Sequence, residues 1–137
     1  MTAPLTGGCL CGAIRYAVNA PITGLRACHC TDCQKTSGSG ASVNAVIQSK
    51  DFTLNQGSPK RFAIRADSGR ILYRFFCGNC GSPVYSQREG NTERMVVRAG
   101  TLDDSSAMKI TSNIWTKSAR PWSHIDPESE QLPGNPA

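Results

Sequence analysis

The sequence lacks any hydrophobic stretch that could cross a membrane. A bilayer-spanning helix needs about 20 consecutive apolar residues, and no segment of the chain approaches that length. Residues 1–8 also lack a basic region followed by an apolar core, which a secretory signal requires. We therefore expect a cytoplasmic protein with no membrane partner. Phosphate-binding loops, dinucleotide-binding fingerprints, metalloprotease helices and nucleophile elbows are absent too, so these enzyme classes are not indicated.

Blocks of like charge are also missing. The chain carries 15 lysine and arginine residues against 10 aspartate and glutamate residues, which gives a net charge of +5. The basic residues stand singly along the sequence, as at Arg15, Arg26 and Lys35. Scattered positive charge suits a small anionic substrate better than a polyanion. We therefore do not expect nucleic acid as a partner.

The hydrophobic pattern predicts a mainly β protein with one domain. Short segments alternate apolar and polar residues, and turn signals such as Asp67-Ser68-Gly69 separate them, which is typical of antiparallel sheets. We expect the domain to cover residues 1–125, with one short helix at 31–36. Residues 126–137 contain three prolines and few apolar side chains, so we expect an extended or disordered tail. The predicted strands are 14–18, 43–47, 62–64, 71–76, 84–85, 95–98 and 110–115.

Seven cysteines gather in three short clusters. An odd number of closely spaced cysteines, in a chain without an export signal, does not suit a disulfide framework, because the cytosol keeps thiols reduced. Cysteines two or three residues apart converge well on a metal ion instead. The clusters are Cys9-Leu10-Cys11, Cys28-His29-Cys30-Thr31-Asp32-Cys33 and Cys77-Gly78-Asn79-Cys80.

The first and third clusters together supply four thiolates, which is enough to close one tetrahedral zinc site. Cys9 and Cys11 leave the same face of an extended segment, and the turn from Cys77 to Cys80 places both of its sulfurs on one side. A four-sulfur site has no open position and is structural. Joining the two pairs closes a loop of about 70 residues at a cost on the order of 4 kcal/mol. Structural zinc binding releases about 10 kcal/mol or more, so binding prevails.

The second cluster then offers Cys28, Cys30 and Cys33 to a second zinc ion. Three protein ligands leave the fourth zinc position to water or substrate, as in reactive sites. Three thiolates donate charge to the metal, so it acidifies water less than zinc held by imidazoles does. A bound thiol still loses its proton and stays nucleophilic. The sequence therefore predicts two zinc ions per chain, the second suited to handling a thiol.

Other ligand arrangements stay open at this level. Cys30 and Cys33 could join Cys77 and Cys80, although the intervening segment, residues 34–76, far exceeds the usual spacer. His29 could complete the second site, but it alternates with its cysteine neighbours and should point away from them if the segment is extended. His124 is the other candidate for a fourth ligand. Iron could also occupy sulfur sites.

At these residues the sequence resembles the glutathione-dependent formaldehyde-activating enzyme family, which also includes centromere protein V-like proteins. The resemblance covers nearly the whole chain, from Gly7 to about Ile125. The chain departs from the family pattern at Gln34, where a basic residue is frequent, and at Asn113, where a histidine is frequent. The resemblance rests on Gly8-Cys9-Leu10-Cys11-Gly12, Cys28-His29-Cys30-Thr31-Asp32-Cys33 and Phe76-Cys77-Gly78-Asn79-Cys80-Gly81, and more weakly on Arg98-Ala99-Gly100-Thr101-Leu102-Asp103, Ile114-Trp115 and Pro121-Trp122.

The resemblance implies a fold, a ligand set and an activity. The fold is of the Mss4-like (β-tent) type, with small antiparallel sheets organised around zinc. The activity is condensation of formaldehyde with glutathione to S-hydroxymethylglutathione, a carbon–sulfur lyase reaction read in reverse. The ligands that it implies are Cys9, Cys11, Cys77 and Cys80 at a structural zinc, and Cys28, Cys30 and Cys33 at a reactive zinc.

Three function hypotheses follow from these sites. The first is a zinc-dependent carbon–sulfur lyase-like enzyme that acts on a small anionic thiol such as glutathione, or on its aldehyde adduct. Lys35 is then a candidate for holding a substrate carboxylate. The second is a non-catalytic zinc-binding module that docks a protein or nucleic acid, and a fourth protein ligand at the second zinc would mark it. The third is a thiol or zinc sensor that loses metal on oxidation.

Overall fold

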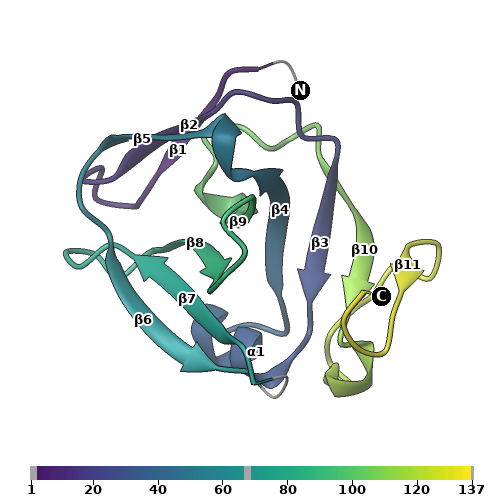
Figure 1. Ribbon diagram of the computed structural model, residues 1–137. Coiled ribbons are helices and arrows are strands. Elements are labelled where there is room, and N and C mark those ends of the chain that lie inside the picture. Colours follow the sequence, from purple (N-terminus) through teal and green to yellow (C-terminus); the bar gives the residue numbers. More distant parts are fainter. Residues whose placement is uncertain (1–2, 67–68, 137) are drawn as a thin grey trace.

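Two β-sheets make up the fold, and both are mainly antiparallel (Figure 1). The structure, a computed structural model, describes residues 3–66 and 69–136. One sheet has the strand order β1-β2-β5, and the other has the order β11-β10-β3-β4-β9-β8-β7-β6. Among the described strands, only β3 with β10 and β10 with β11 pair in parallel. The mainly β fold of small antiparallel sheets is thereby confirmed.

The strands are short, and one helix interrupts them. The strands are β1 (Leu5–Gly8), β2 (Arg15–Val18), β3 (Gly24–Cys28), β4 (Ser42–Gln48), β5 (Phe52–Gln56), β6 (Lys60–Arg65), β7 (Ile71–Phe76), β8 (Pro83–Arg88), β9 (Arg94–Arg98), β10 (Lys109–Ile114) and β11 (Glu130–Gln131). The helix is α1 (Thr31–Ser37), and three 3-10 turns are η1 (Ser49–Asp51), η2 (Ala99–Thr101) and η3 (Thr116–Ser118).

Most predicted elements match these bounds within two residues, but β11, which lies in the predicted tail, and the three strands β1, β3 and β5 were not predicted. Each of the three has a weak local signal: β1 ends in two glycines, β3 starts at a glycine, and most of β5 is exposed. They form because neighbouring strands supply their hydrogen bonds, β3 lying between β10 and β4. Asp67 and Ser68, of the predicted turn, lie outside the described residues.

The apolar core lies between the two sheets. Tyr16, Val18, Val84 and Val97 are at most 1% exposed. A chain of rings joins the sheets: Phe52 of β5 stacks on Tyr16 at 5.2 Å between ring centroids and reaches Tyr85 of β8 at 5.0 Å. Burial of each large apolar side chain contributes about 1.5–3 kcal/mol. This core fixes β7, β8 and the loop between them.

The opposite face of the large sheet carries a row of polar side chains. Register pairs Cys28 with Ser42, Asn44 with Arg98, and Arg74 with Ser86. Side chains two residues apart on a strand share a face, and the pairing of Ser86 with Val96 places Ser86 on the same face as Arg98. These six residues, from β3, β4, β9, β8 and β7, are called the polar row. Five of them are buried, and Arg98 is half-buried.

Residues 126–136, the described part of the predicted tail, are ordered against β10. The short strand β11 pairs with Ser112 and Asn113 of β10. The Leu132 amide donates to the Asn113 carbonyl at 2.9 Å, and the Trp115 indole donates to Asn135 at 2.7 Å. Leu132 also packs against Ile114 and the neighbouring cysteines. Composition did not reveal these contacts, because one apolar side chain and a few hydrogen bonds with distant residues leave no local sequence pattern. The domain boundary at residue 125 remains a prediction.

A membrane-spanning helix is not found in residues 3–66 and 69–136. The helix α1 has seven residues, too few to cross a bilayer.

Candidate metal centres

Four cysteines from two distant loops meet at one place. Cys9 and Cys11 lie between β1 and β2, and Cys77 and Cys80 lie between β7 and β8. The four sulfurs all lie within 4.8 Å of one another. The Sγ atoms of Cys9 and Cys11 are 3.7 Å apart, and those of Cys11 and Cys77 are 3.8 Å apart. Two sulfurs on one tetrahedral zinc, each about 2.3 Å from it, lie about 3.8 Å apart. These residues, called the closed set, therefore have a geometry that fits zinc.

Hydrogen-bond donors point at the sulfurs of the closed set. The Asn79 amide donates to Cys77 Sγ at 3.4 Å, and the Asn79 side chain donates to Cys11 Sγ at 3.2 Å. The hydroxyl of Ser82, 3.2 Å from Cys80 Sγ, and the backbone of Ser82 and Cys11 together lower the pKa of the Cys80 thiol to about 5. Such donors favour the thiolate, which is the form that binds a metal ion.

The other three cysteines meet where β3 leads into α1. Cys28 ends β3, Cys30 is the N-cap of α1, and Cys33 lies in its first turn. Their sulfurs lie within 4.8 Å of one another. The Cys33 amide donates to Cys30 Sγ at 3.3 Å, so the start of the helix fixes this spacing. Cys28 and Cys33 are buried, whereas Cys30 is half-buried and gives access from solvent. These three residues are called the open set.

No fourth cysteine, histidine, aspartate or glutamate joins the open set among the described residues. The ring of His29 faces away, with Nε2 3.1 Å from the Asn113 side-chain oxygen. Cys77 and Cys80 belong to the closed set, so the alternative in which they pair with the helix cysteines does not match the geometry. Metal binding by the individual sulfurs remains a prediction. Three convergent sulfurs are a donor set that fits zinc with three protein ligands.

Two arginines of the polar row lie beside the open set. Arg74 is 8% exposed, and its Nη2 lies 3.9 Å from Cys33 Sγ. Its Nε is buried without a hydrogen-bond partner among the described residues. Arg98 donates to the side-chain oxygen of Asn44, which in turn donates through Nδ2 to Ser42 Oγ at 3.0 Å. The open set therefore has cationic groups on its buried side.

The three thiols of the open set differ in acidity. Hydrogen bonds with Cys28 and Cys30 hold the pKa of Cys33 well below its ordinary value, and Ser42 and Arg74 act in the same direction. Hydrogen bonds with Cys30 and Cys33 raise the pKa of Cys28. A divalent metal ion is the charge that lets neighbouring thiols ionise as well.

The two departures from the family pattern hold neighbouring segments together. The Gln34 amide donates to the His29 carbonyl at 2.8 Å, and its oxygen accepts from Arg120 at 2.9 Å. Asn113 is 3% exposed, and besides contacting His29 it donates to the Ser129 hydroxyl at 2.7 Å. Polar atoms engaged in this way stabilise the structure around the open set. Lys35 by contrast is exposed, in the last turn of α1.

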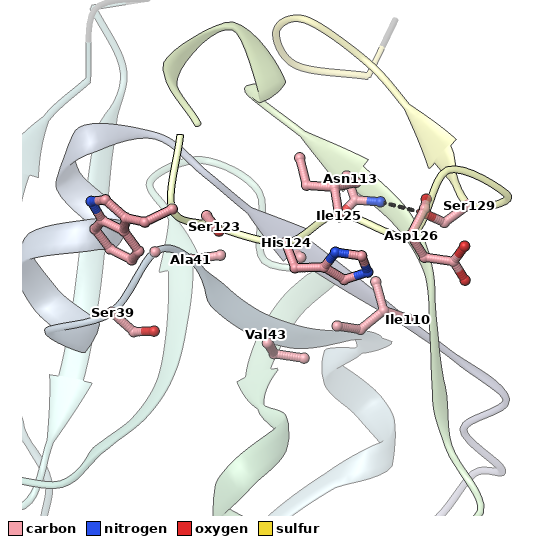
Figure 2. Close-up of a pocket in the computed structure, with 13 residues that line it drawn as sticks. Ser39, Ala41, Val43, Ile110, Asn113, Ser123, His124, Ile125, Asp126 and Ser129 are labelled. Carbon is pink, nitrogen blue, oxygen red and sulfur yellow. Dashed lines mark hydrogen bonds between the residues drawn. The ribbon is translucent and has the colours of Figure 1, made fainter. Parts of the chain in front are cut away.

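A separate cleft of about 420 Å³ is lined by Ala27, Asn113 and His124 (Figure 2). Ala27 precedes Cys28 in β3, and adjacent strand residues point to opposite faces of a sheet. The cleft thus lies across the sheet from the open set. Figure 2 shows the His124 imidazole in this cleft, near the Asn113–Ser129 hydrogen bond. His124 is therefore not placed to complete the open set.

The two sets predict the metal content. We expect freshly purified, reduced protein to contain two zinc ions per chain, because seven sulfurs in two separate groups exceed one coordination sphere. Elemental analysis against protein concentration measures the ratio. A ratio of one, together with three titratable free thiols, would contradict occupancy of the open set.

Comparisons with known proteins agree with the cysteine pattern. Residues 4–118 match the family described as glutathione-dependent formaldehyde-activating enzyme. A Halomonas elongata protein named "Putative glutathione-dependent formaldehyde-activating enzyme" is 28% identical over 85 residues. That match covers 59% of this chain and 54% of the other, so the chain spans about half the length of this curated relative.

The fold also has a counterpart among solved structures. The crystal structure of a Rhodobacter sphaeroides protein superposes with a TM-score of 0.59 at 20% identity, covering 76% of this chain and 98% of that one. At that identity the similarity concerns the fold alone. The family match concerns the sequence as well as the fold, because residues 4–118 include both cysteine sets and most of the chain. This chain belongs to the glutathione-dependent formaldehyde-activating enzyme family.

Proposed function

We propose that the protein is a zinc-dependent carbon–sulfur lyase acting on glutathione, or a similar small anionic thiol, and on its formaldehyde adduct. The observation that carries this proposal is the open set. Its three sulfurs converge without a fourth protein donor among the described residues, and the half-buried Cys30 leaves the set accessible from solvent. Family membership supports glutathione and formaldehyde as the substrates. The closed set is proposed as a structural zinc site.

The chemistry requires one carbon–sulfur bond to form or break. A zinc ion held by Cys28, Cys30 and Cys33 would supply an open position that takes a thiol sulfur and removes its proton. In synthesis the sulfur electron pair adds to the carbonyl carbon of formaldehyde, and the carbonyl oxygen gains a proton from solvent. In the lyase direction the hydroxyl loses that proton and the carbon–sulfur electron pair returns to sulfur. The chain contributes by fixing its three sulfurs on β3 and α1, so that little motion is needed at reaction.

Lys35 is proposed to hold a carboxylate of the thiol substrate. It is exposed in the last turn of α1, two residues beyond Cys33. Glutathione carries two carboxylates, and an exposed ammonium on the helix that carries Cys33 suits one of them. Gln34 is unsuited to this role, since its amide bridges the His29 and Ser118 carbonyls.

Thiol binding tests the proposal. In cobalt-substituted protein we expect glutathione to raise the thiolate-to-cobalt charge-transfer absorption, since the open set gains a fourth sulfur over a constant background from the closed set. About one proton should be released per thiol bound, because the ordinary pKa of a thiol is near 8.5. Absorption titration and pH-stat titration give the two readouts. Unchanged spectra with glutathione and other small thiols, in protein that retains both metals, would overturn the proposal.

A matched pair of variants tests Lys35. We expect Lys35→Glu to weaken glutathione binding about 10-fold through loss of one attractive contact and gain of a repulsive one. Lys50→Glu is the control, because it makes the same charge change on an exposed residue beyond the other end of β4. Equal effects of the two substitutions would indicate a general charge effect and remove Lys35 from the site.

The second candidate function, a non-catalytic zinc-binding module, is less well supported. Its mark would be a fourth protein ligand at the second metal, and the described residues bring none there. The cytoplasmic location remains a prediction from the sequence.

A further inference from the structure

We propose that Arg74 and Arg98 make the open set a receptor for one further anion, so that its fourth ligand binds as a monoanion. This inference rests on the proposed zinc occupancy and thiol chemistry of the same site. It concerns what the two arginines select, and it is separate from recognition of a substrate carboxylate by Lys35.

The charge count carries the first step. Three thiolates contribute three negative charges, a zinc ion contributes two positive charges, and the two guanidinium groups contribute two more. The sum is one positive charge in excess. A thiolate as fourth ligand brings the site to neutrality, whereas water leaves the excess charge in place. Because unbalanced charge is costly away from solvent, neutrality favours the anion.

The arginines lack another counter-charge, which carries the second step. Among the described residues the one ion pair joins Arg15 to Asp103, so neither Arg74 nor Arg98 pairs with a described carboxylate. Arg74 is 8% exposed, its Nη2 lies 3.9 Å from Cys33 Sγ, and its Nη1 donates to the Thr36 hydroxyl at 3.3 Å. Once its thiols are ionised, the open set is therefore the anion that the buried Arg74 and the half-buried Arg98 face. The unpartnered Nε of Arg74 shows that its donors are not exhausted.

The polar row holds Arg98 in place for this role. Its guanidinium donates to Asn44, and Asn44 is anchored by Ser42, which pairs with Cys28 in the sheet. Burial lowers the pKa of Arg98, and the charge of Arg74 acts in the same direction, while the sulfurs of Cys33 and Cys28 act to raise it. A guanidinium group stays protonated in proteins at neutral pH, so Arg98 keeps its positive charge. Its positive charge is thus fixed near the sulfurs by hydrogen bonds.

The same charge favours one side of the carbon–sulfur reaction. The sulfur of an S-hydroxymethyl adduct is a neutral thioether, and it becomes a thiolate as the carbon–sulfur bond breaks. Positive charge fixed nearby is more favourable to the thiolate than to the thioether. Arg74 and Arg98 therefore stabilise the charge that develops on sulfur during cleavage, with the hydroxyl proton passing to solvent.

The test compares charged and neutral ligands in cobalt-substituted protein. Three probes are used. 2-Mercaptoethanol ionises only on sulfur, azide is a monoanion, and imidazole is a neutral donor. The variants are Arg98→Gln, Arg98→Lys and, as a matched control, Arg94→Gln on the exposed end of the same strand. Arg74→Gln is the second charge-removing variant. Metal content and circular dichroism establish that each variant is folded and loaded.

Removing one positive charge should weaken the binding of 2-mercaptoethanol and of azide about 30-fold, and it should change the affinity for imidazole by less than about threefold. Arg98→Lys should restore most of the anion affinity, and Arg94→Gln should resemble the unmodified protein. Equal losses for anions and imidazole, or no loss in either charge-removing variant, would overturn the inference. If the unmodified protein binds azide well above imidazole but no thiol, the proposed function falls and the charge inference stands. If the unmodified protein binds thiols, and Arg98→Gln and Arg74→Gln both bind them equally well, the charge inference falls and the proposed function stands.

Discussion

Replacing Cys77 with serine should unfold the protein or lower its melting temperature by more than about 10 °C. Cys77 is 2% exposed, packs in the core, and belongs to the closed set that joins the β1–β2 loop to the β7–β8 loop. Structural zinc releases about 10 kcal/mol or more on binding, which is comparable to the 5–15 kcal/mol total stability of a domain. A weakened site therefore removes a large share of that stability. Thermal melts followed by circular dichroism, with zinc analysis, measure the effect.

Chelation offers an independent form of this experiment. A strong chelator at neutral pH should unfold the unmodified protein, and added zinc should restore the folded signal, because metal binding and folding are linked.

The matched control for Cys77→Ser is the Cys30→Ser protein, since it carries the same substitution in the other set. If the Cys77→Ser protein melted at the same temperature as the unmodified protein, the closed set would not be what stabilises the fold.

Replacing Cys30 with serine should leave a folded protein that has lost one metal ion and at least about 100-fold in thiol affinity. Cys30 is the N-cap of α1, and its sulfur accepts from the Cys33 amide. Serine is a favoured N-cap residue and can accept the same hydrogen bond, so the helix should persist. Its hydroxyl is a poor substitute for a thiolate as a zinc ligand. Metal analysis, thermal melts and glutathione titration of the cobalt protein separate these effects.

Cys30→Ala distinguishes the two roles of this residue. Alanine removes both the ligand and the cap, so we expect an additional destabilisation of about 1 kcal/mol relative to Cys30→Ser. Thiol binding should be lost equally in both variants. If Cys30→Ser unfolds while Cys77→Ser stays folded, the structural and reactive assignments of the two sets must be exchanged.

The cysteine sets could be predicted from the sequence because their information is local. Each pair or triplet lies within a few residues, and the thiolate count of zinc leaves few ways to combine them. The strands with clear alternation, such as β2 and β4, were predictable for the same reason. In these segments the local pattern and the tertiary fold agree.

The surroundings of the open set could not be predicted in this way. Arg74 and Arg98 stand on β7 and β9, and only the register through β8 places both beside Cys33. A charged residue flanked by apolar ones in a predicted strand was the one available signal, and it is shared by many edge strands. The roles of Gln34 and Asn113 depend on the tail and on residue 120, whose positions are set by long-range contacts. Long-range register is not encoded in a short window of sequence.

The separation of the closed set along the chain has a consequence for biosynthesis. The open set is complete once residue 33 has been made, whereas Cys9 and Cys11 must wait for Cys80 before their site exists. During translation at about 5–20 residues per second, the first hairpin therefore remains without its partner for several seconds. We expect the open set to acquire metal on the nascent chain and the closed set to assemble last. A cell short of zinc should then accumulate chains whose N-terminal hairpin is undocked and open to proteolysis.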